Sequence, residues 1–201
     1  MTRKLMYGLA IAAMAMGLQS CGSQARPENR DGHDLWLGDI RAVTSAQRSV
    51  LLDQYDQELG DEGFRIRMNE KKEYEVQANT SAGLMYGTYH LKRLIDCGEM
   101  DPTKEIVEVP AFRYRVLNHW DNPNGTVERG YAGRSLWKWD ELPGKIRPEY
   151  EEYARANASI GINGTVLNNV NADACMLTHE YLEKVRVLAD IFRPYGIKVY
   201  L

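Results

Sequence analysis

The sequence predicts an α/β protein in two parts, a small α+β unit followed by a parallel sheet or barrel. Two observations support this fold class. Residues 63–78 contain two short runs of alternating apolar and polar side chains, which is typical of a β-hairpin. From residue 112 onward the apolar pattern switches from strand to helix and back, ending in a third strand. That order is typical of a parallel sheet whose strands are joined by helices.

The composition excludes several classes of protein. The 201 residues are 44% hydrophobic and 26% charged, as in an ordinary globular protein. The formal net charge of −3 argues against nucleic-acid binding, which requires clustered excess cations. Three cysteines cannot form a disulfide framework, so we expect Cys97 and Cys175 to be buried thiols. No set of histidines and cysteines has metal-ligand spacing, and we expect neither a metal ion nor a cofactor.

The N-terminus predicts an export signal. A short basic start, Thr2-Arg3-Lys4, precedes the uncharged run Leu5–Leu18. Fourteen residues are too few to span a bilayer as a helix, but they match the apolar core of a signal peptide. We therefore assign residues 1–20 to a signal peptide and the polar residues 21–32 to a tether.

The run ends in Leu18-Gln19-Ser20-Cys21-Gly22, which resembles a bacterial lipoprotein signal. This resemblance implies cleavage before Cys21 and lipidation of that residue, so that membrane attachment occurs only through the lipid anchor. We expect an exported bacterial lipoprotein, either periplasmic or anchored in the outer membrane. The alternative is a simple secretory signal in which Cys21 is incidental.

Residues 33–110 are predicted to form the α+β unit. Each of its elements has a local pattern: alternation for the strands, a capping residue and apolar spacing for the helix. Gly83 and Gly87 lie four residues apart on one helical face, so that this face can approach a sheet closely. We expect residues 101–112 to be a linker. The predicted elements are strands at Asp34–Leu37, Gly63–Met68 and Tyr74–Ala78, and a helix capped by Thr80 or Ser81 that runs to about Ile95.

Residues 111–201 are predicted to alternate between strands and helices. Pro148 with carboxylates behind it opens one helix, and Thr178 caps an amphipathic one. The chain ends inside an apolar strand, so we expect the sequence to be a fragment of a longer protein. The predicted elements are strands at Phe112–His119, Thr165–Leu167 and Ile197–Leu201, a helix from Pro148 to about Ser159, and a helix with apolar positions Tyr181, Leu182, Val185, Leu188, Ala189 and Phe192.

Two polar loops follow the first two strands of this second part. In parallel α/β folds ligands bind at the carboxyl ends of the strands. The first loop, residues 118–137, is rich in aromatic, amide and glycine residues, and the second loop, residues 168–173, is an amide cluster. Aromatic faces beside directional hydrogen-bonding groups suit the recognition of sugars.

The residues of these loops resemble a known family. The chain is similar to the xylan-debranching α-glucuronidases, glycoside hydrolase family 67, over roughly residues 34–201. The segments that carry the resemblance are Leu117-Asn118-His119-Trp120-Asp121-Asn122, Glu128-Arg129-Gly130-Tyr131-Ala132-Gly133-Arg134-Ser135, Gly161-Ile162-Asn163-Gly164-Thr165-Val166-Leu167-Asn168-Asn169-Val170-Asn171, Gly60-Asp61-Glu62-Gly63-Phe64-Arg65-Ile66 and Gly83-Leu84-Met85-Tyr86-Gly87.

The resemblance implies that residues 111–201 form the first three strands of an incomplete (β/α)8 TIM barrel. It also implies an exo-acting, inverting hydrolase that releases glucuronic acid, or its 4-O-methyl ether, α-1,2-linked to xylo-oligosaccharides from glucuronoxylan. The catalytic carboxylates of the family lie on later barrel strands, so we assign no catalytic residue and expect the fragment alone to be inactive. The stretch between Trp36 and Gly60 is shorter than in the family, and we expect a strand and a helix to be missing from it.

By position in the family motif, Trp120 is predicted to be the aromatic wall of the uronic-acid pocket, and Val170 an apolar patch near the sugar O4. His119, Asp121, Asn169 and Asn171 are weaker candidates for lining or supporting that pocket. Each has a plainer interpretation. Trp120 could instead be a core aromatic, and Val170 could be ordinary packing.

Two alternatives remain open. One is another glycosidase with the same two-domain plan, such as a β-N-acetylhexosaminidase, and the other is a non-catalytic glycan-binding lipoprotein. We expect oligosaccharides and no nucleic acid as partners, and the resemblance leaves open a homodimer of the full-length protein.

Overall fold

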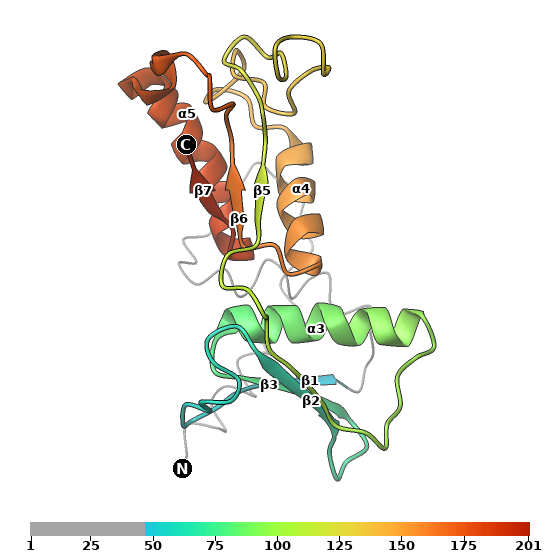
Figure 1. Ribbon diagram of the computed structural model, residues 1–201. Coiled ribbons are helices and arrows are strands. Elements are labelled where there is room, and N and C mark those ends of the chain that lie inside the picture. The colour runs from blue at the N-terminus through green and yellow to red at the C-terminus, as the bar shows by residue number, and fades with distance from the viewer. Residues whose placement is uncertain (1–46) are drawn as a thin grey trace, which may run out of the picture.

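The computed structural model describes residues 47–201, which form a mixed α/β fold with two small sheets and three α-helices (Figure 1). The predicted signal peptide, the tether with Cys21 and the predicted strand Asp34–Leu37 lie outside the described residues. Within residues 47–201, no helix is both long enough and apolar enough to cross a bilayer.

The first unit is a four-stranded sheet in the order β1-β3-β2-β4. The predicted hairpin is confirmed, because β2 and β3 are antiparallel with Ile66 opposite Val76. Both of these side chains are fully buried on the face that the alternation marked as apolar. The strands of this sheet are β1 (Gln47–Leu51), β2 (Phe64–Met68), β3 (Tyr74–Ala78) and β4 (Ile106–Glu108).

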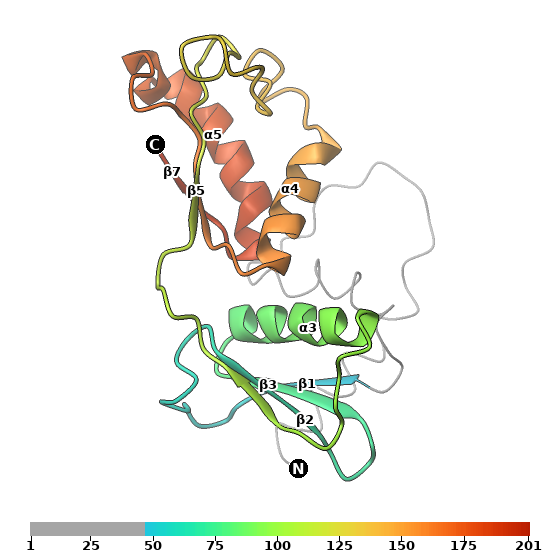
Figure 2. The same cartoon turned by 45° about the vertical axis from the view of Figure 1, so that its right-hand side comes forward.

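The helix α3 (Ser81–Asp96) packs across this sheet, as Figures 1 and 2 show. Of the two predicted capping residues, Thr80 is the one that caps it, because its side chain accepts a hydrogen bond from the backbone N–H of Gly83 at 3.2 Å. The close approach at the two glycines is also confirmed. A Cβ atom on Gly87 would lie 2.6 Å from Cγ1 of Val76, and one on Gly83 would lie 2.5 Å from the carbonyl oxygen of Gly63.

Residues between Trp36 and Gly60 contain a strand that the sequence pattern did not indicate, β1, which pairs in parallel with β3. Two predictions for the first unit are wrong. The expected linker contains β4, which pairs with β2 at the edge of the sheet. Cys97 is exposed rather than buried, because it lies at the C-terminal end of α3, where the chain turns away from the sheet.

The second unit is a three-stranded parallel sheet in the order β5-β6-β7. Its helices are α4 and α5, and Figure 2 shows both on the same face of the sheet. The predicted order of strands and helices is therefore confirmed. The elements are β5 (Val116–Asn118), α4 (Pro148–Ser159), β6 (Gly164–Val166), a 3-10 turn η1 (Ala174–Leu177), α5 (His179–Phe192), a 3-10 turn η2 (Arg193–Tyr195) and β7 (Lys198–Tyr200).

Two details of this unit differ from the predictions. The first strand was predicted at Phe112–His119, but β5 is limited to Val116–Asn118 and is exposed along its length. Within residues 47–201 it is an edge strand that pairs with β6, and the helices cover one face of the sheet. Leu182 was expected on the buried face of α5 but is 42% exposed, because it lies in the first turn of the helix, near the loops.

A polar junction connects the two units. The guanidinium of Arg115 lies 2.8 Å from the carboxylate of Glu62. The side-chain amide of Asn163 donates to the same carboxylate at 3.1 Å and to the carbonyl of Arg113 at 2.8 Å. The ring of Tyr86 on α3 lies beneath the Arg115 guanidinium, 5.6 Å from it. These contacts fix the parallel sheet against α3.

Candidate functional site

The first and second loops lie at the same end of the parallel sheet (Figure 1). This follows from the parallel pairing, because the carboxyl ends of neighbouring strands meet at one edge. The backbone N–H of His119 donates to the carbonyl of Val166 at 3.0 Å and so extends the pairing of β5 with β6 into the loops. The two strands therefore bring the predicted site residues together.

Trp120 and Val170 are both open to solvent at this edge, with 38% and 71% of their surface exposed. Trp120 directly follows the last ladder contact of β5, and its carbonyl accepts a hydrogen bond from the backbone N–H of Glu128 at 2.8 Å. Asn171 is also exposed, next to Val170 in the second loop. Within residues 47–201, Trp120, Val170 and Asn171 are thus all accessible at the edge where the two loops meet.

Asp121 is 4% exposed, so its carboxylate is covered. The carboxylate accepts a hydrogen bond from the hydroxyl of Ser135, and that hydroxyl oxygen accepts the backbone N–H of Trp137 at 3.0 Å. Asp121 therefore holds the end of the first loop against its beginning. This arrangement favours the supporting role for Asp121 over direct contact with a ligand.

His119 is half-buried and belongs to an aromatic cluster. Its ring lies 5.3 Å from that of Trp137, and its Nε2 is 2.7 Å from the hydroxyl of Tyr153. The Tyr153 hydroxyl is in turn 3.0 Å from the Thr165 hydroxyl on β6. Burial lowers the pKa of His119, and the nearby charge of Asp121 opposes this shift more weakly. The imidazole is therefore neutral near pH 7. It packs beneath the first loop.

Asn169 is 3% exposed and holds the two loops together. Its backbone N–H donates to the carbonyl of Asp121 at 2.7 Å, and its side-chain amide donates to the carbonyl of Glu128 at 3.2 Å. The side-chain amide of Asn122 donates to the same carbonyl at 2.7 Å. Asn122 belongs to the quoted motif but was not selected as a site residue. The Glu128 carbonyl could not be predicted, since a backbone acceptor leaves no trace in the side-chain pattern.

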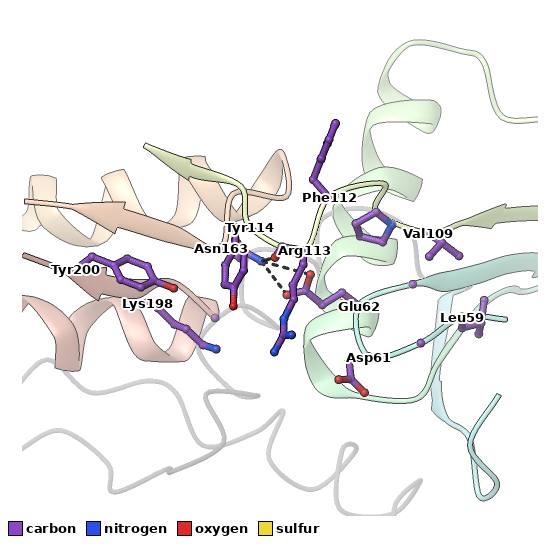
Figure 3. Close-up of a pocket in the computed structure, with 14 residues that line it drawn as sticks. Leu59, Asp61, Glu62, Val109, Phe112, Arg113, Tyr114, Asn163, Lys198 and Tyr200 are labelled. Carbon is purple, nitrogen blue, oxygen red and sulfur yellow. Dashed lines mark hydrogen bonds between the residues drawn. The ribbon is translucent and has the colours of Figure 1, made fainter. Parts of the chain in front are cut away.

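One hollow lies beside the loops, and another lies at the opposite end of the parallel sheet. A hollow of about 410 Å³ lies beside the two loops, and Cys175 at its wall is half-buried. A hollow of about 510 Å³ lies at the amino ends of the strands, where Glu62 and Asn163 meet (Figure 3). The first is lined by Asn122, Pro123, Asn124, Asp173, Cys175 and Tyr181. Within residues 47–201, no three His, Cys, Asp or Glu side chains are grouped so as to hold a metal ion.

Two family models cover most of the chain. Residues 12–91 match the N-terminal domain of glycosyl hydrolase family 67, and residues 95–201 match the middle domain of the same family. The boundary between the two matches, at residues 91–95, falls within the C-terminal part of α3.

Several fungal proteins are similar to the chain. The probable α-glucuronidase A of Aspergillus clavatus is 36% identical over 142 residues, 71% of this chain and 17% of the relative. The probable α-glucuronidase A of Aspergillus oryzae is 33% identical over 196 residues, 92% of this chain and 23% of the relative. The chain thus spans about a fifth of the length of the curated relatives that it matches.

Solved structures support the fold. A GH138 enzyme targeting pectin rhamnogalacturonan II has a TM-score of 0.56 at 16% identity, covering 86% of this chain and 23% of that enzyme. A GH115 4-O-methyl-α-glucuronidase with specificity for decorated arabinogalactans has a TM-score of 0.52 at 14% identity, covering 89% of this chain and 27% of that enzyme. The two domain matches decide the family: the chain belongs to glycosyl hydrolase family 67.

Proposed function

We propose that the protein is an α-glucuronidase that releases glucuronic acid, or its 4-O-methyl ether, α-1,2-linked to xylo-oligosaccharides during xylan breakdown. The observation that carries the proposal is the exposed Trp120 at the carboxyl end of a parallel strand, with Val170 exposed on the neighbouring loop. Membership in family 67 and the relatives named α-glucuronidase support it.

In this proposal the indole of Trp120 is a wall of the uronic-acid pocket, and Val170 is the apolar patch beside the sugar O4, where a methyl ether is tolerated. Asn171 lies next to Val170 and lines the same edge, while Asp121, Asn169 and His119 support the loops from beneath. We assign neither the acid nor the base to these residues. Among them Asp121 is the one carboxylate, and it is covered and bonded to Ser135.

We further propose that β5, β6 and β7 are the first three strands of a (β/α)8 barrel. Their parallel order, with α4 and α5 on one face, supports this assignment. An inverting reaction requires an acid and a base about 6.5–9.5 Å apart on opposite sides of the sugar ring, with a water molecule between the base and the ring. These carboxylates are proposed to come from other strands of the barrel.

The test is the product formed by the protein expressed from its complete coding sequence. Incubated with aldouronic acids, it is expected to release glucuronic acid first as the β-anomer, observed by proton NMR. Release of the α-anomer first would contradict inversion. Hydrolysis of a β-N-acetylglucosaminide instead would favour the hexosaminidase alternative, and binding without release would favour the glycan-binding alternative.

For localisation we propose a lipid anchor at Cys21. Labelled palmitate is expected to enter the wild-type protein in a bacterial host and not the Cys21→Ser variant. Equal labelling of both would refute the anchor. Sedimentation of the purified protein would measure the homodimer that the family resemblance leaves open.

A further inference from the structure

The backbone carbonyl of Glu128 is the point at which the two loops meet. It accepts the side-chain amides of Asn122, at 2.7 Å, and of Asn169, at 3.2 Å. The N–H of the same residue donates to the carbonyl of Trp120 at 2.8 Å. Glu128 has a φ of 59°, a left-handed conformation that is uncommon for a residue other than glycine. Its backbone is therefore held in an unusual conformation by contacts on both sides.

Asn169 makes the contacts that cross from one loop to the other. Its backbone N–H reaches the carbonyl of Asp121, the residue after Trp120, at 2.7 Å. Its side-chain oxygen accepts the N–H of Asn171 at 2.9 Å, so its amide nitrogen faces Glu128. Asn169 is thus bonded to the neighbours of Trp120 in one loop, and it directly precedes Val170 in the other.

We propose that Asn169 is a positioning residue that fixes the separation of Trp120 and Val170, and with it the width of the uronic-acid pocket. The side chain is 3% exposed, so it cannot lie in the open pocket itself. An amide suits this place because it presents a donor to Glu128 and an acceptor to Asn171 at once. The identity of the ligand rests on the proposed function, whereas the coupling of the loops rests on these contacts alone.

The test compares Asn169→Asp with a matched control, Asn157→Asp, in the protein expressed from its complete coding sequence. Each substitution replaces a side-chain amide that donates to a backbone carbonyl, and for Asn157 the acceptor is Tyr153 at 2.7 Å. Asn157 lies near the C-terminal end of α4, at the opposite end of the sheet from the loops. Both variants are expected to melt at a lower temperature than the wild type, which controls for loss of stability.

The discriminating readouts are tryptophan emission and the affinity for free glucuronic acid measured by calorimetry. Asn169→Asp is expected to shift the emission, and the shift is expected to vanish in a Trp120→Phe background. It is also expected to weaken glucuronic acid binding by about tenfold or more, equivalent to 1.4 kcal/mol per factor of ten. Asn157→Asp is expected to change neither quantity.

The outcomes distinguish the positioning role of Asn169 from the proposed α-glucuronidase function. Unchanged emission and affinity in a folded Asn169→Asp variant would overturn the positioning role. A shift in Trp120 emission, in a protein that binds no glucuronic acid even as wild type, would support the coupling and overturn the proposed function. If Asn169→Asp fails to fold, Asn122→Ala removes the other amide on the Glu128 carbonyl. A shift in Trp120 emission in that variant would support the role, and no shift would overturn it.

Discussion

Arg115 and Glu62 form an ion pair of 2.8 Å between the two units, although they are 53 positions apart in the chain. The pair is well covered, with 17% of the Arg115 side chain and 28% of the Glu62 side chain exposed. Arg115 also donates to the carbonyls of Gly161 at 2.5 Å and Phe112 at 2.6 Å. One side chain therefore holds three segments together.

Replacing Arg115 with glutamine is expected to lower the free energy of unfolding by about 2–4 kcal/mol, because a covered carboxylate loses its charged partner and two carbonyls lose the guanidinium donor. Urea denaturation measures this difference. The matched control is Arg186→Gln, since Arg186 is 59% exposed and pairs with Glu183 at 2.9 Å on the surface of α5. Exposed pairs contribute about 0–1 kcal/mol, so equal losses in the two variants would contradict the junction.

Gly87→Ala tests the close approach of α3 to its sheet. Alanine favours a helix over glycine by about 1 kcal/mol, but the new Cβ would lie 2.6 Å from Val76 and 2.8 Å from the ring of Phe64. The overpacking is expected to prevail, with a net loss of about 1–3 kcal/mol in thermal or urea unfolding. Gly144→Ala is the control, because its Cβ meets nothing closer than 3.7 Å. A stabilised Gly87→Ala variant would show that the approach is not tight.

Local patterns predicted most of the elements. The hairpin, α3, α4 and α5 were found because alternation, capping residues and helical spacing are properties of short segments. The strands β1 and β4 were missed because each is held by a partner strand distant in sequence: Gln47 pairs with Tyr74, and Ile106 with Ile66. Neither strand has the burial that would create an alternating pattern.

The position of the site was predictable from the sequence, but the hydrogen bonds that hold its two loops together were not. The rule that ligands bind at the carboxyl ends of parallel strands placed both loops at one edge. Aromatic and amide residue types pointed to Trp120 and Asn169 without distinguishing an exposed side chain from a buried one. Asn169 is buried because its amide donates to the backbone carbonyl of Glu128. A backbone acceptor cannot be recognised from the pattern of side chains.

The half-buried imidazole of His119 predicts a pH dependence of stability. Its pKa is lowered in the folded state mainly by burial, so the unfolded state binds the proton more readily. The stabilising contribution is complete above the unfolded pKa of about 6.5 and is lost as the pH falls below it. His119→Gln is expected to flatten the fall in unfolding free energy between pH 7.5 and 5.5, by at most about 1.4 kcal/mol per pH unit. An unchanged slope would contradict a half-buried His119 whose pKa is lowered in the folded state.

The raised pKa of Tyr86 predicts a loss of stability as the pH rises, whereas His119 predicts a loss as the pH falls. Burial, and secondarily the charge of Glu62, raise its pKa to about 12. Because the folded pKa exceeds the unfolded value of about 10, the contribution is complete below pH 10 and is lost as the pH rises toward 12. Tyr86→Phe is expected to lose less stability than the wild type between pH 9.5 and 11.5. Parallel pH profiles of the two proteins would contradict this.

The central claim is that Trp120 contacts the sugar acid, and the most direct measurement is kcat/KM for glucuronic acid release from aldouronic acids. In the protein expressed from its complete coding sequence, Trp120→Ala is expected to lower kcat/KM by about 10- to 100-fold, that is by about 1.4–2.8 kcal/mol. Tyr55→Ala, which removes a 51% exposed aromatic ring in the first unit, is expected to leave it unchanged. Equal kcat/KM values for Trp120→Ala and the wild type, or no release by either, would contradict the account.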